Sequence, residues 1–120
     1  MRRLVFALDL TDDPAAIAEY EAWHRAGSIW PAIVASLRES GLTNVEIFRT
    51  GNRLCLIMDA PDGFSLEAKA AADASNPEVQ AWERLMWTYQ RALPWAATGE
   101  KWLPMQRIFS LAELRGASGT

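Results

Sequence analysis

The chain has 120 residues, a size typical of one domain. Half of its residues are hydrophobic, six are tryptophan and its formal net charge is only -3. Lys and Arg are scattered, so neither nucleic acid nor an anionic membrane is an expected partner. The single cysteine, Cys55, excludes an internal disulfide, and with one histidine in the chain no zinc site is expected.

The first predicted elements are a strand and a helix. Leu4–Leu10 is an apolar run of strand length, and no apolar run is long enough for a transmembrane segment. Asp13 is a predicted N-cap, with Pro14 at the first helical position. Ile17, Tyr20 and His24 follow at helical spacing, which places all three on the inward face. No signal-peptide pattern precedes the strand, and we expect a cytoplasmic protein.

A second helix and a hairpin come next. Gly27 is predicted to end the first helix, Pro31 to open the second, and Gly41 to follow its C-terminus. Two strands, 44–49 and 53–59, are separated by Thr-Gly-Asn and are predicted to form a β-hairpin.

The remaining elements are two helices and one strand. Residues 64–72 form a helical pattern, and Asn76-Pro77 is a second cap-plus-proline start. Apolar residues at three-four spacing extend this helix to Leu93, and Pro94 is predicted to end it. The last strand is predicted at 103–111, within a single domain of residues 1–112. Residues 113–120 are expected to be a disordered tail.

The order of these elements predicts an α+β fold. Strand, helices, strand, strand, helices, strand is the split βαβ pattern of a ferredoxin-like fold, with one antiparallel sheet and helices on one face. The other face is apolar and uncovered, so a second copy of the chain is expected to cover it in a homodimer.

Tyr20 and His24 are the candidate acid–base residues. Residues four apart on a helix share a face, so the phenol and the imidazole point into the same space. Imidazole exchanges protons near neutral pH without much tuning. The chain has no glycine-rich phosphate loop, no nucleophile elbow and no metal-ligand spacing, so we expect a site without metal or cofactor.

Other residues could form the wall of such a site. Trp82 would suit a sugar face, but its helical spacing, shared with Val79 and Met86, favours a core position. Glu46 alternates with apolar neighbours on its strand, and Glu46 or Asp59 could accept hydrogen bonds from ligand hydroxyls. Lys69 is expected to be solvated, as are Arg49 and Arg53, and Cys55 to be a small core residue.

Several of these motifs together resemble the L-rhamnose mutarotase family. They are Tyr20-x-x-x-His24, Ile29-Trp30-Pro31, the hairpin 44–59, Asn76-Pro77-x-Val79-Gln80-x-Trp82 and Met105–Phe109. The resemblance covers residues 5–111. It implies a dimeric ferredoxin-like α/β barrel that interconverts the α and β anomers of a 6-deoxyhexose without a metal or nucleotide.

The resemblance also implies roles for individual residues. It makes His24 the catalytic histidine, Tyr20 a catalytic and sugar-contacting residue, and Trp82 a sugar-binding residue. Glu46 is a further candidate for binding sugar hydroxyls. The family's second tryptophan falls on Glu83, and one of its tyrosines falls on Val45. These departures leave L-rhamnose and L-fucose as alternative substrates.

Two other functions also fit the residues. A cofactor-free ferredoxin-like oxygenase acting on an aromatic metabolite would use tryptophan and histidine in a cavity. A small-ligand-binding regulatory module would need no catalysis. Accelerated anomer exchange, without consumption of substrate or oxygen, distinguishes a mutarotase from both.

Overall fold

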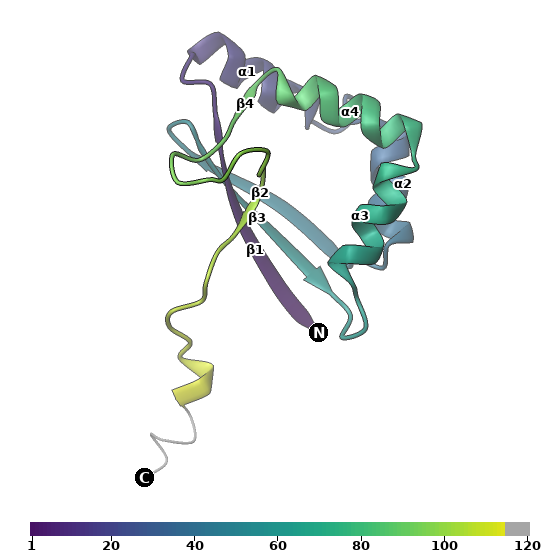
Figure 1. The fold of residues 1–120 in the computed structure, drawn as a ribbon, viewed down its shortest axis with the longest axis vertical. Coiled ribbons are helices and arrows are strands. Elements are labelled where there is room, and N and C mark those ends of the chain that lie inside the picture. The colour runs from purple at the N-terminus through teal and green to yellow at the C-terminus, as the bar shows by residue number, and fades with distance from the viewer. Residues whose placement is uncertain (115–120) are drawn as a thin grey trace.

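The computed structural model describes residues 1–114, which form one antiparallel sheet with four helices on one of its faces (Figure 1). The predicted disordered tail falls mainly on Arg115–Thr120, outside the described residues, while its first two positions belong to a short 3₁₀ helix. In chain order the elements are β1 (Arg2–Leu10), α1 (Pro14–Trp23), α2 (Pro31–Glu39), β2 (Asn44–Thr50), β3 (Arg53–Ala60), α3 (Leu66–Ala74), α4 (Pro77–Trp87), β4 (Gln90–Arg91), β5 (Leu103–Pro104) and the 3₁₀ helix η1 (Ala112–Leu114).

The sheet has the strand order β2-β3-β1-β4, and β5 also pairs with β1. Every pairing is antiparallel, with Phe6 opposite Leu56 between β1 and β3, and Ile47 opposite Leu56 between β2 and β3. This order confirms the ferredoxin-like α+β fold. The β2–β3 hairpin turns at Gly51, which has a φ of 55°, a left-handed conformation that favours glycine.

Local sequence signals start α1, α2 and α4 where they were predicted, whereas α3 begins at Leu66, two residues after its predicted start, with Ser65 as its N-cap. The Asp13 side chain accepts a hydrogen bond from the Ala16 N–H at the start of α1. The Asn76 side chain accepts from the first-turn N–H groups of α4, and both helices have proline at their first position. Caps of this kind satisfy backbone donors that the helix itself leaves free. Within residues 1–114, no helix is long and apolar enough to cross a membrane.

The two faces of the sheet differ because side chains alternate along each strand. Leu54 and Leu10 pack against the helices in one hydrophobic cluster with Tyr20, Trp82 and Met86. Cys55 points the other way, on the open face, and is half-buried where a core position was predicted. The helix-covered face therefore holds the core.

Helix α4 is shorter than predicted. It ends at Trp87, and the Thr88 hydroxyl donates to the Leu85 carbonyl at its C-terminus. Gln90 and Arg91 then pair with β1 as β4. Leu93 is buried, as the helical spacing predicted. The predicted extension of the helix to this residue was wrong because the preceding residues, Gln90 and Arg91, form a strand. Sheet pairing supplied a stronger constraint than the local period.

The last strand is also shorter than the predicted 103–111. Leu103 and Pro104 pair with β1, Met105 donates one more hydrogen bond to Val5, and the chain then leaves the sheet (Figure 1). Ile108 and Phe109 are exposed. The apolar pattern that predicted a strand therefore has no partner surface at these positions within residues 1–114.

Candidate active site

A cavity of about 570 Å³ lies between the sheet and the helices. Its floor is apolar and comes from the helix-covered face of the sheet, including Phe6, Val45, Ile47, Leu56 and Met58. All four helices contribute to the remaining walls. A largely apolar cavity with a few polar groups is the usual form of a small-molecule site.

His24 lines this cavity at the C-terminus of α1. Its Nδ1 lies 2.7 Å from the carbonyl oxygen of Tyr20. Because a carbonyl can only accept, Nδ1 carries the proton and Nε2 carries the free lone pair. Burial lowers the pKa of His24, an effect that the hydrogen bond to Tyr20 partly opposes. At neutral pH the imidazole is therefore neutral and able to accept a proton.

Tyr20 lies beside His24, with ring centroids 4.5 Å apart, so the structure brings together the two predicted catalytic residues. The phenol oxygen accepts a hydrogen bond of 3.2 Å from the amide nitrogen of Gln90. Burial raises the pKa of Tyr20 to about 12, with a further contribution from the charge of Glu83. The phenol therefore stays protonated and can donate to a ligand.

Aromatic rings extend from this pair along one wall. The ring of Trp82 is edge-on to the rings of His24 and Trp30, with ring centroids 5.5 Å and 5.2 Å apart. Trp82 is buried in the hydrophobic core and also lines the cavity. Trp82 is thus a core residue that also faces the cavity, and its contact with a ligand stays a prediction.

Glu46 is not brought to the cavity. Its neighbours Val45 and Ile47 line the cavity, so Glu46 points to the open face, where it accepts a hydrogen bond from Asn44. Asp59 is on the same face and is paired with Arg3. A role for either carboxylate in this cavity has no support from their positions.

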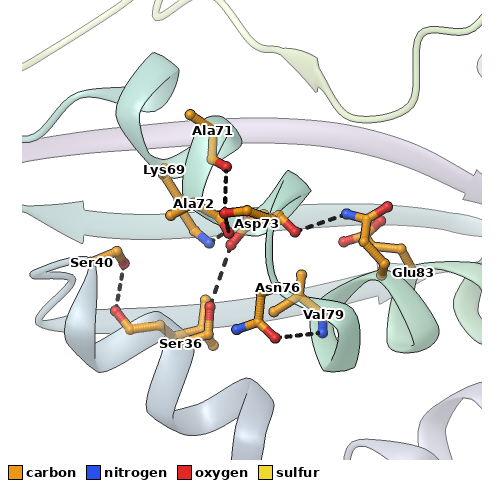
Figure 2. Close-up of polar contacts among 12 residues, drawn as sticks. Ser36, Ser40, Lys69, Ala71, Ala72, Asp73, Asn76, Val79 and Glu83 are labelled. Atoms are coloured by element: carbon orange, nitrogen blue, oxygen red, sulfur yellow. Dashed lines mark hydrogen bonds and ion pairs between the residues drawn. The ribbon is translucent and has the colours of Figure 1, made fainter.

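Lys69 was predicted to be solvated, but its side chain is mostly buried and lines the cavity. Its ammonium group lies 2.8 Å from the carboxylate of Asp73, one turn later in α3. Ser36 donates to the same carboxylate from α2, as Figure 2 shows. The prediction was wrong because Lys69 faces the cavity, where its ammonium group is paired with Asp73.

Gln90 and Lys101 were not predicted as site residues, and Glu83 was noted only as a departure from the family's second tryptophan. Gln90 was assigned to a helix, and its pairing with Leu10 depends on a long-range contact. Glu83 and Lys101 form an ion pair in the cavity wall. The position of Glu83 directly after Trp82 was the one available signal. Within residues 1–114, no group of His, Cys, Asp and Glu side chains is arranged to hold a metal ion.

Fold and site together define a ferredoxin-like protein with a histidine and a tyrosine side by side in a largely apolar cavity. The family model for L-rhamnose mutarotase matches residues 3–111, and the chain belongs to this family. The predicted class of activity, a sugar mutarotase and thus an isomerase, is confirmed at this level.

Individual relatives carry the names of two sugars. The chain is 52% identical to an L-fucose mutarotase of Xanthomonas campestris pv. campestris, over 94% of this chain and 90% of that one. It is 30% identical to an L-rhamnose mutarotase of Acidiphilium cryptum, over 92% and 99%. The crystal structure of an L-rhamnose mutarotase from Formosa agariphila has the same fold, with a TM-score of 0.67 at 19% identity over 92% and 99% of the two chains.

Proposed function

We propose that this protein interconverts the α and β anomers of a 6-deoxy-L-hexose, with L-fucose preferred to L-rhamnose. The observation that carries the proposal is the pairing of His24 with Tyr20 in the cavity, their rings 4.5 Å apart. The preference for L-fucose rests on the 52% identity to an L-fucose mutarotase. The apolar floor suits the methyl group of such a sugar, because burying a methyl group there is favourable.

Mutarotation needs a base at the O1 hydroxyl and an acid at the ring oxygen. In the proposed reaction, Nε2 of His24 accepts the O1 proton, the C1–O5 bond breaks and the C1=O1 double bond forms. The ring oxygen receives a proton, either from the imidazolium or from the Tyr20 phenol. After rotation about C1–C2 the same steps run in reverse and return every proton. Positioned proton transfer typically accelerates a reaction by roughly 10²–10⁴-fold.

The aromatic wall supports the binding of a pyranose. The face of Trp82 can pack against sugar C–H groups while Tyr20 donates to a sugar oxygen. Gln90 holds the Tyr20 oxygen from the other side, so the phenol hydrogen is directed away from the amide. In this proposal Tyr20 orients the sugar. The exchange rate of Tyr20→Phe shows whether the phenol also transfers a proton.

We also infer that two copies of the chain pair through their open faces. Arg3–Asp59 and Arg53–Asp9 ion pairs flank an apolar centre on this face. Phe48 in this centre is 53% exposed, and an exposed aromatic within an apolar patch is typical of an interface. The centre consists of Val5, Ala7, Phe48, Cys55 and Ile57. A cytoplasmic location is part of the same proposal and is tested by cell fractionation.

Saturation-transfer NMR tests the activity. The wild-type protein is expected to accelerate anomer exchange of L-fucose most, L-rhamnose next and D-glucose least. The discrimination against the additional hydroxyl of glucose is expected to stay within about 10²-fold, the limit for an apolar pocket. Equal exchange of all three sugars would contradict the proposed substrate class, and no acceleration of any of them would contradict the proposed activity.

A further inference from the structure

The cavity has two acidic residues in its walls, and they differ in the contacts they make. Both oxygens of Asp73 are engaged, one by Lys69 and the other by Ser36 (Figure 2). Glu83 is paired through Oε2 with Lys101. Within residues 1–114, its Oε1 has no hydrogen-bond partner. Glu83 is therefore the acidic group of the cavity that still has an acceptor to offer.

Glu83 lines the same cavity as Tyr20 and His24. It directly follows Trp82, whose ring stands 5.5 Å from that of His24. Its negative charge contributes to the raised pKa of Tyr20, as a nearby carboxylate should. A sugar held against Tyr20 and His24 would thus share the cavity with this carboxylate.

Lys101 fixes the position of this carboxylate. It comes from the segment between β4 and β5, and its side chain is only 18% exposed. Its ammonium group binds Glu83 and also lies 5.2 Å from the centre of the Trp87 ring. Both contacts are with residues of α4, so Lys101 is held against this helix and in turn holds the Glu83 carboxylate at the cavity wall. A carboxylate held in place before the ligand arrives loses little freedom on binding.

We propose that Glu83 determines sugar specificity by accepting a hydrogen bond at Oε1 from a ring hydroxyl away from C1. Lys101 acts as a positioning residue for Glu83. A sugar that lacks this hydroxyl, or has it in the opposite configuration, leaves the carboxylate without a partner. This inference rests on the proposed mutarotase activity and adds a specificity residue to it.

The test compares L-fucose with its 2-, 3- and 4-deoxy analogues in the wild-type protein and in Glu83→Gln. For the wild type, one analogue should have a kcat/KM lower by roughly 10–100-fold, the range for a hydrogen bond to a charged group. Glu83→Gln keeps an acceptor but removes its charge and its ion pair with Lys101, so it should raise the KM for L-fucose by up to a similar factor and leave kcat nearly unchanged. With the sensitive analogue, the further loss should be smaller in the variant than in the wild type.

Glu78→Gln is the matched control, because it makes the same chemical change on an exposed residue of the same helix outside the cavity lining. Its kinetics should equal those of the wild type. An unchanged KM for L-fucose in a folded Glu83→Gln protein would overturn the proposal. The proposal would also be overturned if every deoxy analogue lost as much kcat/KM in Glu83→Gln as in the wild type.

Lys101→Met provides a second test if Glu83→Gln does not fold. It keeps the carboxylate but removes its anchor, so the difference between L-fucose and the sensitive analogue should shrink. An unchanged difference would overturn the proposal. A wild-type protein that exchanges no sugar would instead contradict the proposed function itself, so the two failures are distinguishable.

Discussion

The amide nitrogen of Gln90 donates to the phenol oxygen of Tyr20 over 3.2 Å and so joins β4 to α1 inside the core. Both side chains are buried, and the amide oxygen of Gln90 has no partner within residues 1–114. The contact holds the phenol against the cavity next to His24.

Tyr20→Phe should lower stability as well as activity. It removes the acceptor of the Gln90 amide and leaves a buried donor unpaired, which typically costs about 1–3 kcal/mol. Urea unfolding measures this loss. Gln90→Met, combined with Tyr20→Phe, should recover part of it because the unpaired amide is then absent. A Tyr20→Phe protein as stable as the wild type would show that the hydrogen bond contributes nothing.

His24→Asn should reduce anomer exchange by roughly 10²-fold or more while the fold is retained. Asparagine keeps a polar group of similar reach but cannot exchange protons near neutral pH. Exchange NMR gives the rate, and circular dichroism checks the fold. Wild-type exchange in a folded His24→Asn protein would make the imidazole a structural group and contradict the mechanism.

The pH dependence should show an acid limb below the ordinary histidine pKa of 6.5, because burial lowers the pKa of His24. The rate of anomer exchange should be at its maximum at pH values above this limb, where His24 is neutral, and should fall as His24 becomes protonated. Stability follows the same direction: the unfolded chain takes up the proton first, so stability declines as the pH falls below about 6.5. In His24→Asn this part of the decline should disappear. A wild-type limb above 6.5 would contradict the assignment.

Phe48→Asp should convert a dimer into a monomer, because it places a charge in the apolar centre of the open face. Sedimentation of the wild type should give twice the chain mass at micromolar concentration. Ile47→Asp is the matched control, since Ile47 is the neighbour on the same strand that lines the cavity. It should alter sugar exchange and leave the mass unchanged. A monomeric wild type would rule out the paired arrangement.

Helix caps were predicted correctly from short motifs, whereas the ends of α4 and β5, which depend on pairing with β1, were not. The caps at Asp13 and Asn76 involve atoms a few residues away, so short motifs predicted them correctly. Gln90 pairs with Leu10, which no window along the chain can show. Without that pairing, the apolar spacing up to Leu93 predicted a continued helix.

The residues of the site show the same difference between local and long-range contacts. Tyr20 and His24 are one turn apart on one helix, and their proximity could be predicted from spacing. The position of Glu46 could not be predicted, because the alternation of side chains separates the two faces of a strand without showing which face the helices cover. The contact between Glu83 and Lys101 joins α4 to a later loop, so its existence required the fold.

The alternation along β3 separates two kinds of change at neighbouring positions. Leu56 and Met58 shape the floor of the cavity, whereas Cys55 and Ile57 never touch it. A mutation at Leu56 can adapt the cavity to a different sugar while the opposite surface keeps its chemistry. Changes on the cavity floor and changes on the open face can therefore arise independently, because neighbouring residues of one strand face opposite sides of the sheet.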